Sequence, residues 1–290
     1  MPTQLSSGLV FWFFMHQNQK NKNKKDNIST TQPRQVLHRT QNVLLNPTRN
    51  VVLKIFWFLY QPIYMNFTQH TLRHHTHIVV SVAFHAILPL LATGACDKTV
   101  ILYNLRTSPP SIQNQLRGHD DDVHCVVFHP NKPLLASGSA DTSVLIYDVS
   151  TSPPTKQHDL NDHVHDVNSV AFHSSFSLFA TGSQDKSVIL YNLQTVPATI
   201  QHRFKNYNNS INAVTFHPFL LILATGSAGN SIILHNISMS PPTIMHMLIH
   251  HTRKVDCVVF HRNFQLLAIG SMDNSTLLYD ISTLLSSMSS

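Results

Sequence analysis

Four side chains between residues 119 and 147 are of types that a hydrolase could use. His119, Ser137 and Asp141 are the ingredients of a Ser–His–Asp triad, and Tyr147 follows closely. The same residue types recur at a spacing of 44 residues, however, whereas an active site normally occurs once. No single serine is marked as an activated nucleophile. We therefore expect these side chains to be structural and the protein not to be an enzyme, with no catalytic residue.

The elements that position these side chains belong to an internal repeat. A phrase that begins with Phe-His and has a glycine ten residues after the Phe recurs five times, 44 residues apart, starting at Phe84, Phe128, Phe172, Phe216 and Phe260. In the second copy, β-rich runs at residues 123–128, 134–138, 143–147 and 155–160 are separated by Pro, Gly and Ser. Four short strands cannot bury both faces of a sheet alone, so neighbouring repeats must stack. Radial repetition of four-stranded sheets produces a β-propeller.

Specific residues link the repeat to a known family. Gly118-His119 opens the second copy, the run Leu-Ala-Ser-Gly-Ser at 135–139 precedes Asp141, and Tyr147-Asp148 closes it. This pattern resembles the WD40 family, whose units of about 40–45 residues run from Gly-His to Trp-Asp. The resemblance covers residues 71–290 and implies an all-β, WD40-type propeller with five recognisable four-stranded blades. We divide the chain into residues 1–50, a basic polar segment expected to be disordered, residues 51–65, an apolar linker or blade remnant, and residues 66–290, the propeller domain.

Closure of the ring stays open at this point. A fourth strand after the fifth repeat is missing, while a strand-like piece at residues 66–73 precedes the first repeat. Members of the family commonly close the ring by pairing such pieces, which also removes exposed sheet edges. Residues 31–65 could form a degenerate sixth unit, although they match poorly. The alternatives are a small closed ring, an open arc completed by a partner or a second copy, and a fragment of a longer gene.

The resemblance implies that the recurring residues form a hydrogen-bonded tetrad in each blade. A partly buried Asp needs partners, which His N–H and Ser or Thr O–H groups can supply. The expected tetrads are His75, Thr93, Asp97 and Tyr103; His119, Ser137, Asp141 and Tyr147; His163, Thr181, Asp185 and Tyr191; and, with Ile269 in place of the hydroxyl, His251, Asp273 and Tyr279. In the fourth repeat Tyr207, Gly229 and His235 depart from the pattern around Thr225. We predict that its network is largely lost and that this blade is the least well tied.

Composition and charge agree with a strand-rich protein. All 14 acidic residues among the 290 are Asp, which prefers caps and turns over helices. Residues 1–70 carry eight Lys/Arg and one Asp, whereas residues 71–290 carry twelve Lys/Arg and thirteen Asp. The net charge of +6 therefore belongs to the N-terminal segment. A nucleic-acid contact is expected only through that basic tail.

Metal, cofactor and membrane sites are not expected. Cys96, Cys125 and Cys257 lack CxxC spacing, which argues against zinc and favours a reducing compartment, the cytoplasm or the nucleus. The five Phe-His histidines are too far apart to share a metal ion, whose ligands lie about 2 Å away. The apolar run at residues 51–64 contains Lys54 and Pro62 and is shorter than the ~20 residues of a spanning helix.

A protein–protein interaction scaffold or adaptor is the predicted function. The resemblance implies that partners bind the face formed by the His-bearing and Asp-bearing loops. The candidate partner-binding residues are Asp121, Asp122, His124, His165, Asp166, Asn168, Gln184, Asn212, Lys254, Asp256 and Met272. The cluster of Asp in the second and third repeats suggests a basic partner, attracted by charge. The alternatives are a nucleic-acid-associated subunit that uses the basic tail and a truncated or degenerate propeller without independent function, and an incomplete ring would allow a homo-oligomer.

Overall fold

The computed structural model describes residues 69–205 and 207–282. The chain divides into two units, one made of residues 1–17 and 72–290 and the other of residues 18–71. All the described strands lie in the first unit, and the described residues 69–71 of the second are not in a strand. The predictions for residues 1–65, including the disordered tail and the sixth unit, lie outside the described residues.

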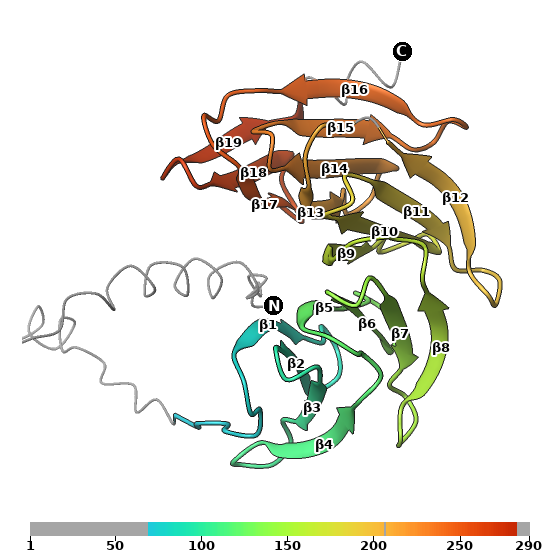
Figure 1. Cartoon of the computed structure of the whole chain (residues 1–290), viewed down its shortest axis with the longest axis vertical. Coiled ribbons are helices and arrows are strands. Elements are labelled where there is room, and N and C mark those ends of the chain that lie inside the picture. The colour runs from blue at the N-terminus through green and yellow to red at the C-terminus, as the bar shows by residue number, and fades with distance from the viewer. Residues whose placement is uncertain (1–68, 206, 283–290) are drawn as a thin grey trace, which may run out of the picture. The chain divides into compact units, whose positions relative to one another are not determined.

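In the described part of the chain, nineteen strands form five antiparallel sheets (Figure 1). The first sheet contains β1 (Val79–Phe84), β2 (Leu90–Ala95), β3 (Val100–Asn104) and β4 (Ser111–Leu116). The second contains β5 (Val123–Phe128), β6 (Leu134–Ser139), β7 (Val144–Asp148) and β8 (Thr155–Leu160). The third contains β9 (Val167–Phe172), β10 (Leu178–Ser183), β11 (Val188–Asn192) and β12 (Thr199–Phe204). The fourth contains β13 (Ile211–Phe216), β14 (Ile222–Ser227), β15 (Ile232–Asn236) and β16 (Thr243–Leu248), and the fifth contains β17 (Val255–Phe260), β18 (Leu266–Ser271) and β19 (Thr276–Asp280).

Each sheet is a meander in which consecutive strands pair. The two middle strands of the second sheet, β6 and β7, are buried along almost their whole length, whereas the outer strand β8 is largely exposed. Middle strands covered on both faces explain the continuous apolar runs in the sequence, since a half-buried strand would alternate. The β6–β7 turn holds Thr142 in the left-handed region at φ 73°, and the equivalent turn residues Lys98, Lys186, Asn230 and Asn274 also have positive φ.

Four apolar clusters join consecutive sheets. The cluster between the first and second sheets contains Leu102 of β3 with Val123, Val126 and Phe128 of β5. Equivalent clusters join the second sheet to the third, the third to the fourth and the fourth to the fifth. Stacking of neighbouring sheets therefore supplies the core that a single repeat cannot build.

The recurring Phe-His pair belongs to these interfaces. The ring of His85 lies 5.1 Å from Phe128 of the next sheet, and the same contact recurs at 5.2–5.3 Å for His129–Phe172, His173–Phe216 and His217–Phe260. His85 Nδ1 accepts hydrogen bonds from the turn N–H groups of Ile87 and Leu88, and Nε2 donates to the carbonyl of Lys132 in the second sheet. The histidine thus fixes its own turn and contacts the next repeat.

The first and fifth sheets each have one uncovered face. Phe84 is 53% exposed, whereas Phe128, Phe172, Phe216 and Phe260 are 6–7% exposed. Leu278 of β19 is 66% exposed, whereas the equivalent Leu102 is fully buried. No apolar cluster among the described residues joins the fifth sheet to the first. The five described blades therefore do not form a closed ring.

The structure confirms the all-β prediction and corrects one element. The four strands expected in the second repeat are present to within a residue or two. The predicted strand at residues 66–73 is wrong for its described part, because residues 69–73 are not in a strand and the fifth sheet has three strands. Strand-like composition is not sufficient there, since an outer strand also needs a neighbouring edge to pair with. Within the described ranges, no helix is long and apolar enough to cross a membrane.

Candidate functional site

In all the described sheets except the fourth, a His–Asp pair ties the loop before the first strand to the turn between the second and third strands of the same sheet. In the first sheet, His75 Nδ1 lies 2.9 Å from Asp97 Oδ2, and His75 Nε2 lies 2.7 Å from Thr93 Oγ1. In the second sheet His119 lies 2.9 Å from Asp141 Oδ2 and 2.8 Å from Ser137 Oγ. In the third sheet His163 lies 2.7 Å from both Asp185 Oδ2 and Thr181 Oγ1. A neutral imidazole that donates from Nδ1 to the carboxylate leaves Nε2 to accept from the hydroxyl.

A further hydroxyl, which the sequence analysis missed, completes these networks. Ser143 Oγ donates to Asp141 Oδ1 at 2.6 Å, and the backbone N–H of Asp120 donates to Oδ2 of the same carboxylate at 2.8 Å. Thr99, Ser187 and Ser275 occupy the same position, two residues after the turn Asp, and make the same bond. The recurrence of Ser or Thr at that spacing was the signal in the sequence.

These carboxylates are held in their ionised form. Burial alone would raise the pKa of Asp97, but hydrogen bonds from Thr99, the Thr76 N–H and His75 outweigh it and lower the pKa to about 2. The pKa values of Asp141 and Asp185 are lowered in the same way, against burial. The Asp–His–hydroxyl order resembles that of a hydrolase triad, but Ser137 and Thr181 are 1% and 0% exposed, so a substrate cannot reach their oxygens. The arrangement fixes loops.

The tyrosine of each predicted tetrad contacts the residue before the histidine. Tyr103 Oη lies 3.2 Å from His74 Nδ1, and Tyr191 Oη donates to Asp162 Oδ2 at 3.0 Å. Tyr279 pairs with His250 in the fifth sheet. In the second sheet this position is Gly118, where an added Cβ would lie 2.5 Å from Tyr147 Oη. The glycine of the Gly-His pair therefore leaves room for the phenol.

The fourth sheet has an exchanged network, which corrects the prediction that its network is largely lost. Tyr207 occupies the histidine position, and its Oη lies 2.7 Å from Thr225 Oγ1 and 2.8 Å from His235 Nε2. His235 in turn occupies the aromatic position and is buried. Tyr and His have exchanged places, so both hydrogen-bonding groups remain beside the threonine.

The fifth sheet is the one whose network has a missing partner. His251 Nδ1 bonds Asp273 Oδ2 at 2.8 Å, but Ile269 replaces the hydroxyl of the other sheets. His251 Nε2 is consequently buried without a hydrogen-bond partner in the described structure. An unpartnered buried nitrogen is costly, so the network of this sheet, rather than that of the fourth, is the least well satisfied.

The candidate partner-binding residues lie on the loops and inner strands that these networks fix. Several of them bond across sheets: His124 Nε2 lies 3.4 Å from Asp166 Oδ2, and the Asn168 and Asn212 amides donate to the carbonyls of Ile211 and Val255. Lys254, in the loop before β17, pairs with Asp256 of that strand at 3.4 Å. The exposed candidates are Asp121, His165, Gln184 and Met272, while Asp122 is partly buried.

Five carboxylates gather on the loops of the second and third sheets. We call Asp120, Asp121, Asp122, Asp162 and Asp166 the acidic rim. Arg203 lies 3.7 Å from Asp162, and His124 faces Asp166. No ion pair within the described residues involves the side chains of Asp120, Asp121 or Asp122. Lys98 donates to the backbone carbonyl of Asp120, so cationic groups can approach this loop.

Comparison with known protein families identifies the repeat that builds these sheets. The sequence model of the WD40 family (WD domain, G-beta repeat) matches residues 66–104, 110–148, 154–192, 198–236 and 242–280. The chain belongs to the WD40 repeat family. A comparison with curated proteins gives no match. The segment 110–148 runs from β4 through β7, so a WD40 repeat combines the outer strand of one blade with three strands of the next.

The cysteines of this WD40 protein are not activated. Burial, with the nearby carboxylates of Asp122, Asp97 and Asp121, raises the pKa of Cys96 to about 11. Burial also raises the pKa of Cys125 to about 12 and raises that of Cys257. Thiols that stay protonated at neutral pH are poor nucleophiles and poor metal ligands. Among the described residues, no group of three His, Cys or Asp side chains is placed to hold a metal ion.

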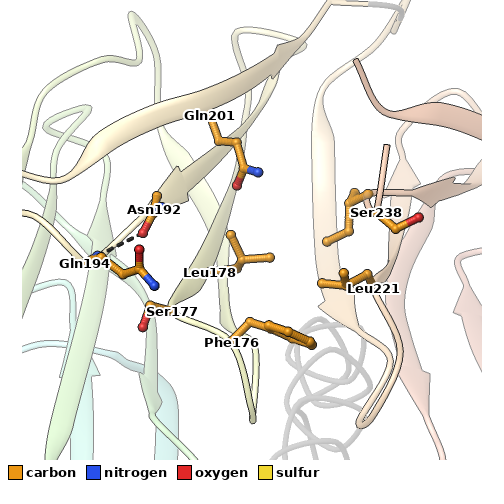
Figure 2. Close-up of a pocket in the computed structure, with 9 residues that line it drawn as sticks. Phe176, Ser177, Leu178, Asn192, Gln194, Gln201, Leu221 and Ser238 are labelled. Carbon is orange, nitrogen blue, oxygen red and sulfur yellow. Dashed lines mark hydrogen bonds between the residues drawn. The ribbon is translucent and has the colours of Figure 1, made fainter. Parts of the chain in front are cut away.

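One hollow of about 250 Å³ lies between the third and fourth blades of the WD40 domain. Figure 2 shows Phe176, Ser177 and Leu178 on one side and Leu221 and Ser238 on the other. The remaining lining residues are Asn192, Gln194, Gln201 and Ile237. Its lining therefore contains no titratable or nucleophilic side chain suited to acid–base or covalent catalysis beyond two serines without an adjacent base.

Proposed function

We propose that this WD40 protein is a non-enzymatic adaptor of the cytoplasm or nucleus whose acidic rim binds a basic segment of another protein. WD40 domains generally mediate protein–protein interactions and are generally not enzymes. The same Asp–His–hydroxyl network recurs in the first three blades, and its hydroxyls on Thr93, Ser137 and Thr181 are buried, which supports a structural role over a catalytic one.

The observation that carries this proposal is the run Asp120–Asp122. Asp120 and Asp121 are exposed, and neither they nor Asp122 have a side-chain ion-pair partner in the described structure. Two hydrogen bonds hold the loop to the β6–β7 turn: the Asp120 N–H donates to the Asp141 carboxylate, and the Ala140 N–H donates to the Asp122 carbonyl. Adjacent carboxylates on a preorganised loop attract cationic side chains without a large cost in conformational entropy.

Binding of an arginine-rich peptide tests this function. Calorimetry with the full chain should show binding that weakens as salt is raised, and no binding of the same peptide with glutamine in place of arginine. The double variant Asp121→Asn/Asp122→Asn should bind about tenfold more weakly. Asp159→Asn/Asp280→Asn, which removes the same charge away from the rim, is the matched control. Equal affinities of the two double variants would contradict the proposal.

A further inference from the structure

The four interfaces between consecutive blades of the WD40 domain are built alike: equivalent residues of the repeat recur on each of the two contacting blades. The side that faces the preceding blade, here called the leading face, carries the first-strand residues equivalent to Val123, Val126 and Phe128. The side that faces the following blade, the trailing face, carries residues equivalent to Leu102 and His85. It also contains the recurring glycine, which allows close approach: a Cβ added at Gly226 would lie 2.7–2.8 Å from the methyl groups of Val255 and Val258.

The leading face of the first blade carries this set but is uncovered. Val79 and Val82 are partly exposed, whereas the equivalent valines of the second blade, Val123 and Val126, are 0% and 6% exposed. Phe84 is more than half exposed. The surface therefore has the residues of an interior interface without the blade that would cover them.

The trailing face of the fifth blade is the opposite half of the same interface. Leu278 and His261 are exposed, although their equivalents in the other four blades are buried. A Cβ added at Gly270 would meet only the sulfur of Cys257 from its own blade, because no valine of a following blade lies over it. On this face the glycine, the histidine and the leucine occupy the positions they have in the interior interfaces, but no following blade covers them.

We propose that a second copy of this chain docks head to tail, with its first blade on the fifth blade of its partner copy. The two open faces are complementary position by position. Phe84 of one copy would lie on His261 of the other, as Phe260 lies on His217 within the chain, and Val79 and Val82 would cover Gly270. The interface would continue the four that the chain already builds. It buries different surfaces on the two copies, so it is heterologous.

The mass of the full chain in solution, measured by sedimentation from about 1 to about 100 µM, tests this contact. The wild type should associate to two or more chains as concentration rises. Phe84→Asp should block the leading face and Leu278→Asp the trailing face, so each variant alone should keep the mass of one chain. Both side chains are exposed in the single chain, so circular dichroism should show wild-type folding. Phe219→Asp, at an exposed turn of the fourth blade, is the matched control and should associate like the wild type.

Mixing the two blocked variants identifies the geometry. An equimolar mixture retains one intact leading face and one intact trailing face, so it should form a pair of chains and nothing larger. A wild type that has the mass of one chain at every concentration would overturn the proposal and would indicate that other residues of this chain, or another protein, cover the open faces. Association that survives either variant, or a mixture that stays at the mass of one chain, would also overturn it.

Discussion

The interior interfaces and the two end faces are made from the same repeat, yet they differ in what covers them. Phe128 is 6% exposed between the first and second blades, whereas its equivalent Phe84 is 53% exposed. Leu102 is fully buried and its equivalent Leu278 is 66% exposed. The repeated sequence therefore specifies a surface that requires a neighbour, and burial follows only where the next repeat is present.

The polar networks show a similar contrast. In the first three blades the histidine has a partner on each ring nitrogen, and the fourth blade preserves its network through the exchange of Tyr207 and His235. In the fifth blade no group among the described residues bonds His251 Nε2. The end blade thus has both a less complete apolar interface and a less complete hydrogen-bond network.

The largest difference between interior and end should appear at the recurring glycines. A Cβ added at Gly182 would lie 2.6 Å from Ile211 Cγ2 and 2.9 Å from Val214 Cγ1 across the interface. We expect Gly182→Ala to lower the free energy of unfolding by about 3 kcal/mol, because two branched side chains on another blade must move. At Gly270 the added Cβ meets one cysteine sulfur, so Gly270→Ala should cost about 1 kcal/mol.

Denaturant unfolding of both alanine variants at the same low protein concentration measures this difference. Equal losses at the two positions would mean that the interior interface is not what requires the glycine.

Acid should weaken the interior interfaces. Burial lowers the pKa of His129 to about 4, with nearby Lys132 adding to the effect, and burial lowers the pKa values of His85, His173 and His217 as well. The folded protein therefore binds fewer protons than the unfolded chain, whose histidines titrate near 6.5. Stability should be fully present above pH 6.5 and should fall as the pH drops toward 4, by roughly 2 kcal/mol from His129 alone.

Unfolding measured at pH 7.5, 6.0 and 5.0 checks this dependence, and His129→Gln should flatten it. A variant that keeps the wild-type slope would show that the titrating groups lie elsewhere.

Removal of the phenol oxygen in the fourth blade tests the exchanged network. Tyr207→Phe deletes the group that bonds both Thr225 and His235 while it keeps the ring. We expect a loss of about 1.5 kcal/mol, since two buried polar groups lose a partner. Tyr279→Phe in the exposed part of the fifth blade provides the comparison and should cost less. An unchanged free energy of unfolding in Tyr207→Phe would support the original prediction that the network of the fourth blade is lost.

A hydroxyl supplied to the fifth blade should satisfy its unpartnered histidine nitrogen. Ile269→Thr places a hydroxyl where the other blades have one, within reach of His251 Nε2. Both Ile269→Thr and Ile269→Val remove apolar volume from a fully buried site, so the hydroxyl should make the threonine variant about 1 kcal/mol more stable than the valine variant. Ile269→Val, which has the shape of threonine without its hydroxyl, is the control. If the threonine variant were no more stable than the valine variant, the unpartnered nitrogen would not explain the weakness of this blade.

The smallest expected effect concerns the turn between β6 and β7. Thr142 is the only β-branched residue among the five turn residues with positive φ, a region that β-branched side chains avoid. Thr142→Asn should add about 0.5 kcal/mol, and the reciprocal Asn274→Thr should remove a similar amount. Thermal unfolding of the two variants measures both, and changes of the same sign would contradict the explanation.

The sequence predicts the architecture because strict 44-residue spacing aligns every strand and turn. It does not predict where burial ends, because Phe84 and Phe128 occupy the same repeat position, each before a His, and their burial differs with whether a blade precedes them. The network of the fourth blade was missed because Tyr207 and His235 each differ from the residue type expected at their position. The two side chains nevertheless bond each other, since each supplies the group that the other position lacks. The strand expected at residues 66–73 was wrong for residues 69–73, since composition alone supplies no neighbouring edge.

Hydrogen exchange of the full chain, followed by mass spectrometry at low and high protein concentration, tests most directly whether the two ends are interfaces that lack a partner. At low concentration β1 and β17–β19 should exchange faster than the interior strands β5–β15, because local opening is easiest where one face is uncovered. At high concentration, protection should increase at β1 and β17–β19 and stay unchanged in the interior. Uniform protection of all five blades at low concentration, or ends that do not respond to concentration, would contradict the account.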